Sequence, residues 1–297
     1  MSFQTVTELG EESIVENPVI FRGQGLHTGE SSVVSVENNP NEDGIFFERD
    51  GARAKLIPDR VNNTGRTTSL TNDGGEVVAM TIEHILSAFY ALRIRNANLV
   101  LQEGIEIPIL DGTSDVFLRG IDSVRRRIQK QVGAVTLDVP FMIHDESDDK
   151  RFVRLDMGTG EGVDIRSCVQ YPDSPIAQQQ YDFRYGDFED YRREIALART
   201  SYPFYLRTDE DVERLFQRLK GIRYKGPDQN VNIVDPRYNT GDSMPNNVPR
   251  HKILDFLGDM QVLNLPLANG VKVTLNNAGH RLNNQLVRSI YSNVSHD

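Results

Sequence analysis

The chain has 297 residues, of which 38% are hydrophobic and 26% are charged, and its formal net charge at pH 7 is −10. This composition is typical of a soluble globular protein with room for a sizeable core, and the negative charge disfavours a general nucleic-acid binder. The single cysteine, Cys168, excludes an intramolecular disulfide and a thiolate metal cluster. A metal site would therefore have to use histidine, aspartate and glutamate side chains.

Membrane-spanning and secreted classes are also disfavoured. No apolar run approaches the roughly 18 residues that a membrane span needs. The first residues lack the basic start and the apolar block of a secretory signal. We therefore expect a cytoplasmic protein without a transmembrane segment and without a nucleic-acid partner.

The first part of the chain is expected to contain several strands and a helix. Valine-rich, turn-punctuated sequence predicts strands over residues 32–36 and 44–48. A helix is predicted from an N-cap at Thr81 to about Leu92, because the apolar residues in this segment keep helical spacing. The strands expected after this helix cover residues 98–102 and 105–110.

A basic stretch over residues 125–130 closes this part, and a new strand-like run begins at Ala134. We therefore expect a boundary at about residue 130, between domains 1–130 and 131–297. The elements expected in the second domain are strands near 134–143, 151–156 and 162–171 and helices near 209–220, 250–260 and 281–291. Strands followed by helices, twice over, indicate an α+β architecture with antiparallel sheets.

A short similarity links the two parts. The seven residues from Glu83 to Phe89 can be aligned with those from Arg250 to Phe256, with the histidines of the two segments in line. Seven residues do not establish a duplication, but they fit two related units that face each other.

The predicted helix near 250–260 carries a row of polar side chains. His251, Asp255 and Asp259 recur every four residues, on the side opposite to the apolar residues. A histidine and an aspartate one turn apart can both reach one metal ion. The same spacing also fits a solvated polar face.

Glu83 and His84 fall in the first turn of the helix predicted after Thr81. The helix dipole stabilises a carboxylate there, so we expect Glu83 to remain ionised and able to act as a base. The pair also fits a plain structural role, with Glu83 as a capping charge and His84 as its neighbour.

Two further polar residues are candidates for a site. His280 follows a glycine at the start of a predicted helix, and it could act as a general acid or simply end a loop. A helix N-terminus disfavours a protonated imidazole, so the acid role needs a carboxylate that raises its pKa, for which Asp259 is a candidate. The hydroxyl of Thr200 could stabilise an oxyanion or bond to the backbone.

Together these segments resemble one family. The motifs that occur in family order are Gly25–Gly29 (GLHTG), Thr67–Leu70 (TTSL), Thr81–Leu86 (TIEHIL), Ile107–Gly112 (IPILDG), Ala198–Thr200 (ART), Arg250–Asp259 (RHKILDFLGD) and Gly279–Asn283 (GHRLN). From about Val19 to Arg288 the sequence resembles the zinc-dependent UDP-3-O-acyl-N-acetylglucosamine deacetylases of lipid A biosynthesis. The segment Arg250–Asp259 is the most specific of these motifs.

The resemblance implies a fold and a substrate channel. The fold would consist of two similar α+β domains, each a sheet with helices, with the helices sandwiched between the two sheets. An insert in the second domain, at about residues 200–235, would build a passage for an acyl chain. This chain departs from the family within and after that insert, notably at Ser201–Leu206 and at Lys225–Asn230, which puts acyl-chain preference in doubt.

The resemblance also implies roles for individual residues. The ligands of one Zn²⁺ per chain would be His84, His251 and Asp255, with a fourth position open for water. Glu83 would be the general base, and His280 the general acid with Asp259 supporting its protonated form. Thr200 and Lys252 would help to stabilise the oxyanion and bind substrate. On these roles, Glu83→Ala and His280→Ala should each lower kcat by about 10²-fold or more.

The implied reaction removes the N-acetyl group from UDP-3-O-(3-hydroxyacyl)-N-acetylglucosamine and releases acetate. Lys252, Arg281 and Arg288 are candidates for binding the substrate diphosphate. We expect no obligate protein partner, and transient contact with a membrane surface stays open. The alternatives are a zinc amidase acting on a related acylated amino-sugar nucleotide, and a non-catalytic paralogue that binds a lipid-linked sugar.

Overall fold

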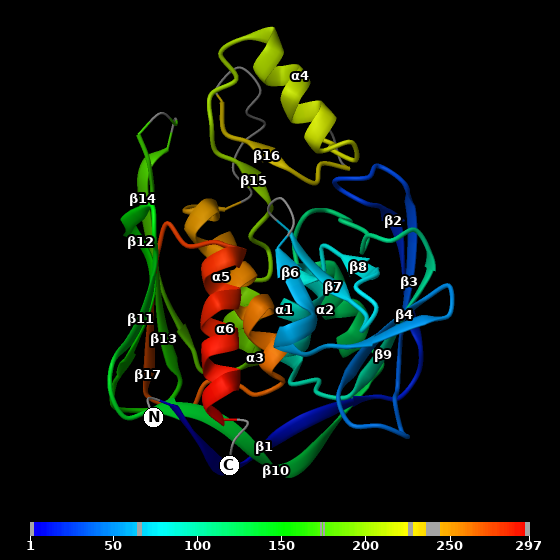
Figure 1. Ribbon diagram of the computed structural model, residues 1–297, viewed down its shortest axis with the longest axis vertical. Coiled ribbons are helices and arrows are strands. Elements are labelled where there is room, and N and C mark those ends of the chain that lie inside the picture. The colour runs from blue at the N-terminus through cyan, green and yellow to red at the C-terminus, as the bar shows by residue number, and fades with distance from the viewer. Residues whose placement is uncertain are drawn as a thin grey trace.

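The computed structural model describes residues 3–63, 67–172, 174, 176–224, 228–235 and 244–294. Two sheets lie on opposite sides of the molecule, and most of the helices fill the space between them (Figure 1). The helices are α1 (Glu83–Leu92), α2 (Asp115–Asp122), α3 (Phe188–Glu194), α4 (Asp209–Arg218), α5 (Asn247–Met260) and α6 (His280–Val294). This arrangement confirms the expected α+β sandwich. Among the residues described, no helix combines the length and apolar character needed to cross a membrane.

The first sheet is built by the first half of the chain. Its strands, in the order in which they lie side by side, are β2 (Val19–Gln24), β3 (Ser31–Glu37), β9 (Ala97–Glu103), β4 (Ile45–Arg49) and β5 (Ala52–Lys55). Neighbouring strands are antiparallel except for β4 and β9, which are parallel.

The second sheet repeats this plan. Its strands, again in the order in which they lie side by side, are β11 (Phe141–Asp145), β12 (Asp148–Met157), β17 (Val271–Asn276), β13 (Val163–Tyr171) and β14 (Ala177–Tyr185). The last strand of each half lies in the middle of its sheet, and the parallel pair, here β13 and β17, occupies the same place. The shared strand order supports the interpretation of the short similarity between Glu83–Phe89 and Arg250–Phe256 as a trace of two related units.

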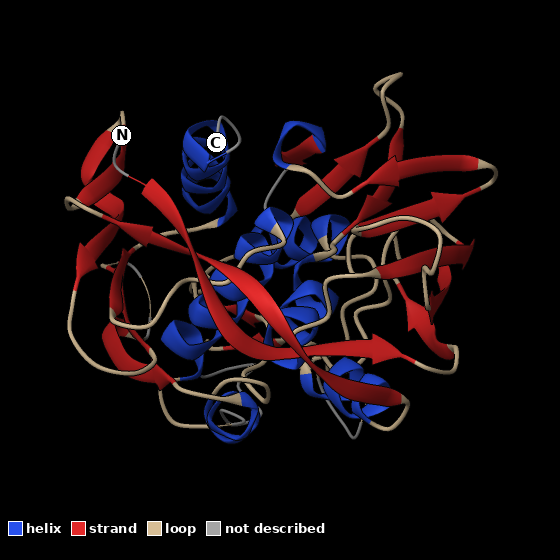
Figure 2. Cartoon of the chain, turned by 90° about the horizontal axis from the view of Figure 1, so that it is seen from below, coloured by secondary structure: helices blue, strands red, loops and turns tan. Residues whose placement is uncertain are grey.

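A long ribbon joins the two halves below the helices. The strand β1 (Phe3–Val15) pairs antiparallel with β10 (Arg125–Leu137) along its whole length (Figure 2). The basic stretch over residues 125–130 therefore lies within a continuous strand. Its side chains form ion pairs across the ribbon, with Arg126 Nε 2.6 Å from Glu16 and Lys130 Nζ 3.3 Å from Glu12. A division of domains at about residue 130 stays a prediction.

Shorter elements complete the fold. They are the three-stranded sheet of β6 (Val61–Asn63), β7 (Thr68–Thr71) and β8 (Val77–Met80), the parallel pair of β15 (Ser201–Tyr202) and β16 (Asn232–Ile233), and the 3₁₀ turns η1 (Pro58–Arg60) and η2 (Gln261–Leu263). With α4, the pair β15 and β16 projects beyond the sandwich (Figure 1). This projection coincides with the insert expected at residues 200–235, and its backbone meets the first half where Gly221 N donates to Leu26 O at 2.9 Å.

The helix α1 differs from its prediction at its start. Its N-cap is Ile82, one residue after the expected Thr81, and the cap makes no side-chain hydrogen bond. The hydroxyl of Thr81 instead donates to the carboxylate of Glu106 at 2.7 Å. Every side chain of α1 is buried, because the helix lies in the centre of the molecule.

The helices α1 and α5 pack backbone against backbone. A Cβ added at Gly258 on α5 would lie 2.1 Å from the carbonyl oxygen of Glu83, the first residue of α1. Real side chains are not accommodated at that distance, so glycine is required for this approach. The approach sets how closely the polar side chains of α5 come to those of α1.

We expect Gly258→Ala to destabilise the protein, because the added methyl group must push the two helices apart. The expected loss is about 1–3 kcal/mol of unfolding free energy, the usual cost of overpacking a core, measured by urea denaturation. The matched control is Gly74→Ala, whose Cβ would meet only a side-chain oxygen of Asn72 at 3.3 Å. Equal stability of the two variants would contradict the assigned helix contact.

Candidate active site

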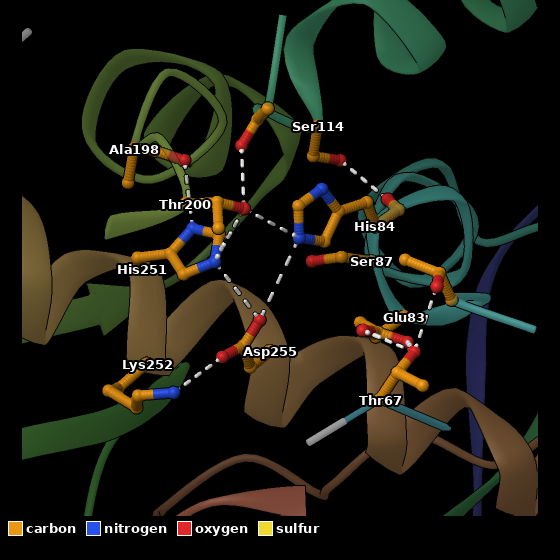
Figure 3. Close-up of polar contacts among 12 residues, drawn as sticks. Thr67, Glu83, His84, Ser87, Ser114, Ala198, Thr200, His251, Lys252 and Asp255 are labelled. Atoms are coloured by element: carbon orange, nitrogen blue, oxygen red, sulfur yellow. Dashed lines mark hydrogen bonds and ion pairs between the residues drawn. The ribbon is translucent and has the colours of Figure 1, made fainter. Parts of the chain in front are cut away.

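Three potential metal ligands from the two halves meet between α1 and α5. They are His84 on α1 and His251 and Asp255 on α5, and their ligand atoms all lie within 4.8 Å of one another (Figure 3). Asp255 Oδ1 is 3.3 Å from His251 Nε2 and 4.0 Å from His84 Nε2. All three residues are buried, so the alternative of a solvated polar face on α5 is wrong.

The hydrogen bonds of His251 define which of its nitrogens can bind a metal. Its Nδ1 lies 3.0 Å from the carbonyl oxygen of Ala198, and a carbonyl can only accept, so Nδ1 carries the proton. In the neutral ring, Nε2 then presents a lone pair toward the carboxylate oxygen of Asp255. Two lone pairs at 3.3 Å need a cation or a proton between them, and a divalent ion satisfies that need.

His84 is held from the other side of the cluster. The hydroxyl of Ser114 donates to the backbone carbonyl of His84 at 2.9 Å. Its Nδ1 is buried without a hydrogen-bond partner among the described residues, and its Nε2 faces His251 and Asp255. Burial lowers the pKa of His84 to about 3 and also lowers that of His251. Both rings are therefore neutral at pH 7, which is the form that binds metal ions.

Asp255 supplies the negative charge of the cluster. Its Oδ2 accepts a bond from the ammonium of Lys252 at 2.9 Å. Burial opposes ionisation, but the charge of Lys252 and the neighbouring His251 hold the pKa of Asp255 below its ordinary value. Two neutral imidazoles and one carboxylate suit Zn²⁺, and three protein ligands leave one position of a tetrahedron open.

Glu83 lies beside the cluster at the start of α1. Its carboxylate accepts from the hydroxyl of Thr67 and from the backbone N–H of Thr68, each at 3.2 Å. Burial raises the pKa of Glu83 to about 7, and the charge of His280 opposes that shift. We expected the helix dipole to keep Glu83 ionised, but burial is the larger influence on its pKa and opposes ionisation. A base with a pKa near 7 is matched to catalysis at neutral pH.

His280 also lies beside the cluster, at the start of α6, with its Nε2 4.0 Å from Asp255 Oδ2. Its Nδ1–H donates to Asp259 at 2.8 Å, and its Nε2 is 3.7 Å from Glu83 Oε1. Burial by itself would lower the pKa of His280, but the carboxylates of Asp259 and Glu83 raise it to about 10. The predicted contact with Asp259 is thus present, and it outweighs the helix N-terminus.

Thr200 closes the cluster on the side of the insert. Its hydroxyl oxygen is 3.4 Å from both His84 Nε2 and His251 Nε2 (Figure 3). The same hydroxyl is 3.3 Å from the backbone carbonyl of Gly112. The Thr200 hydroxyl therefore lies both at the candidate site and within reach of a backbone carbonyl, which are the two alternatives considered for it. A hydroxyl so close to both imidazole nitrogens can donate to an oxygen bound between them.

The residues nominated for the diphosphate are each bound to other groups of the protein. Lys252 contacts Asp255, and the Arg281 guanidinium contacts the buried carboxylate of Asp145. Arg288 donates to the backbone carbonyls of residues 58 and 61. Binding of a diphosphate by these cations stays a prediction.

Sequence reasoning assigned no role to three polar residues of the site. Thr67 and Thr68 bond to Glu83, and Asn283 donates to Asp259 at 2.8 Å. Thr67 and Thr68 belong to the family motif Thr67–Leu70, and Asn283 is the last residue of the family motif Gly279–Asn283. The sequence does not show which groups these side chains contact, so only the motifs point to them.

Two imidazoles and a carboxylate around one point, with a carboxylate and an imidazole beside them, are an arrangement typical of metal-dependent hydrolases. The family model of UDP-3-O-acyl N-acetylglycosamine deacetylases matches residues 12–292. The chain therefore belongs to this deacetylase family of hydrolases.

Individual relatives agree with the family match, and each is named UDP-3-O-acyl-N-acetylglucosamine deacetylase. The protein of Phenylobacterium zucineum is 31% identical over 93% of this chain and 92% of its own length. That of Myxococcus xanthus is 31% identical over 93% of this chain and 84% of its own length. That of Chlamydia trachomatis serovar L2 is 29% identical over 95% and 96%, respectively. The similarity thus extends over both halves.

Proposed function

We propose that this protein binds one Zn²⁺ through His84, His251 and Asp255 and hydrolyses the N-acetyl amide of UDP-3-O-(3-hydroxyacyl)-N-acetylglucosamine. The reaction releases acetate and serves lipid A biosynthesis. The observation that carries the proposal is the meeting of three ligand atoms from opposite halves within 4.8 Å. The substrate follows from the names of the relatives. Because this substrate is a nucleotide-linked sugar, we also propose that the protein acts in the cytoplasm.

The proposed chemistry divides proton transfer between two side chains. A bound zinc ion supplies Lewis acidity and lowers the pKa of water to about 7. Glu83, held by Thr67 and Thr68, takes the proton from the attacking water. His280 gives a proton to the amide nitrogen that leaves, so the sugar departs as a neutral amine. Asp259 keeps the imidazole of His280 oriented and protonated.

Two further residues stabilise the charge that develops on the carbonyl oxygen. Thr200 offers its hydroxyl beside the two imidazole ligands, and Lys252 offers an ammonium fixed 2.9 Å from Asp255. Fixed donors at the place where charge develops lower the barrier, since they need no reorganisation during the reaction. The insert at residues 200–235 stands next to Thr200, and we propose that it receives the acyl chain.

We expect kcat to depend on pH in a bell-shaped manner. The rate rises as Glu83, whose pKa burial raises to about 7, loses its proton. It falls as His280, whose pKa the carboxylates raise to about 10, loses the proton that it must donate. A bound cation favours the deprotonated forms, so each limb lies at or below these values. Initial rates across this pH range check the prediction, and an alkaline limb that survives in His280→Ala would contradict the role of His280.

Product analysis tests the proposed function. The purified protein, loaded with Zn²⁺, is incubated with UDP-3-O-acyl-N-acetylglucosamine, and acetate and the free amine are measured. Release of both in equal amounts supports the proposal. If the protein binds zinc but leaves this substrate intact, the substrate is a different one. Because the segment Ser201–Leu206 departs from the family, other acylated amino-sugar nucleotides are the next substrates to assay.

A further inference from the structure

We propose that Thr68 is a positioning residue that holds Glu83 and Asp259 in fixed places relative to each other. This inference rests on the proposed function, in which Glu83 is the base and Asp259 supports the acid His280. Within the described residues, the hydrogen bonds of Thr68 go to Glu83, Asp259 and Ile82 and not to the metal ligands or to His280. Its effect on the reaction is exerted through the two carboxylates.

All three polar groups of Thr68 are used. The residue opens β7 and is fully buried. Its backbone N–H donates to Glu83 Oε2 at 3.2 Å, and its hydroxyl donates to Asp259 Oδ1 at 2.7 Å. Its carbonyl accepts from the N–H of Ile82 at 3.3 Å, immediately before α1. One residue of the first half thus connects the start of α1 with a carboxylate of α5.

The hydroxyl of Thr68 completes the partners of Asp259. Oδ2 of that carboxylate accepts from His280 Nδ1 and from Asn283 Nδ2, each at 2.8 Å, and Oδ1 accepts from Thr68. Asp259 is 0% exposed, so bulk water cannot replace a lost donor. A buried carboxylate oxygen without its partner is costly, and the carboxylate relieves that cost by rotating. Rotation would turn the imidazole of His280 away from its place.

The neighbouring Thr67 provides a matched control. Its hydroxyl lies 3.2 Å from Glu83 Oε1 and 3.0 Å from Thr81 Oγ1. Within the described part of the chain, its hydroxyl therefore serves Glu83 and not Asp259. Replacing Thr67 by valine removes a similar buried hydroxyl that contacts Glu83 and Thr81 and not Asp259.

The experiment compares Thr68→Val, Thr68→Ser and Thr67→Val in the zinc-loaded chain of 297 residues. Acetate release gives kcat and KM, and proton NMR follows the hydrogen-bonded Nδ1–H of His280, assigned by its loss in His280→Ala. For Thr68→Val we expect kcat to fall by about 10- to 100-fold with little change in KM, since an orienting partner is lost and not a substrate contact. The His280 resonance should shift. Thr68→Ser should restore both readouts, and Thr67→Val should leave the resonance in place.

Two results would overturn the inference. One is a folded Thr68→Val with the kcat and the His280 resonance of the wild type. The other is Thr68→Ser as impaired as Thr68→Val, which would assign the effect to the methyl group. If Thr68→Val does not fold, Thr68→Ala replaces it, and its comparison with Thr68→Ser isolates the hydroxyl. A wild type that releases no acetate would instead refute the proposed function, while the resonance still tests the contact between Thr68 and Asp259.

Discussion

Glu83→Ala is expected to lower kcat by about 10²-fold or more while the protein keeps its zinc ion. The carboxylate lies beside the ligand cluster but is not one of its three members. Its removal would therefore take away the proposed acceptor for the proton of the attacking water and leave the three candidate ligands intact. Steady-state acetate release measures the rate, and atomic absorption measures the zinc content of the same sample.

Glu83→Gln serves as the matched variant for this prediction. It keeps the size of the side chain and one oxygen for the hydrogen bonds from Thr67 and Thr68, but it cannot take up a proton. An equal loss in Glu83→Gln and Glu83→Ala assigns the effect to the missing base. Near-native turnover in zinc-replete Glu83→Ala would remove Glu83 from that role.

His251→Ala is expected to abolish both zinc binding and turnover. The substitution leaves two ligands, and the remaining cluster has one imidazole and one carboxylate, too few to hold Zn²⁺ against a chelator. Zinc content should fall from about one ion per chain toward zero after dialysis against a chelator. Turnover should fall with it, because the proposed reaction needs the ion.

His144→Ala is the control for this loss. His144 lies on the strand β11 and is exposed, and its Nδ1 contacts the backbone of Asp145. Removing this imidazole should change neither zinc content nor rate. Full zinc content in His251→Ala, or equal loss in His144→Ala, would refute the assigned ligand set.

The sequence predicts part of the arrangement of the site. The spacing of His251, Asp255 and Asp259 placed these side chains on one face of α5, because a helix fixes the direction of residues four apart. The burial of that face could not be foreseen. It depends on α1, which meets α5 through a close approach at Gly258 that no periodicity reveals.

The strand β1 and the start of α1 were also hard to predict, because each depends on residues distant in the sequence. β1 has a mixed, partly acidic sequence, and it becomes a strand because β10 supplies hydrogen bonds and opposite charges over its whole length. The sequence alone did not show that the basic stretch of β10 is one side of a ribbon. Thr81 was misplaced as an N-cap because its partner, Glu106, lies 25 residues away in the chain. Each of these features is set by a distant partner.

In the proposed zinc-loaded protein, the division of the ligands between α1 and α5 would make the cation a cross-link between the two halves. The free energy by which the ion would stabilise the association of the two halves must then equal the free energy by which that association would strengthen ion binding, because the two are linked in one thermodynamic cycle. A substitution that weakens the contacts between the halves far from any ligand should lower the affinity for the ion. Removal of the ion should make the two halves easier to separate. The proposed catalytic metal would thus also stabilise the tertiary structure.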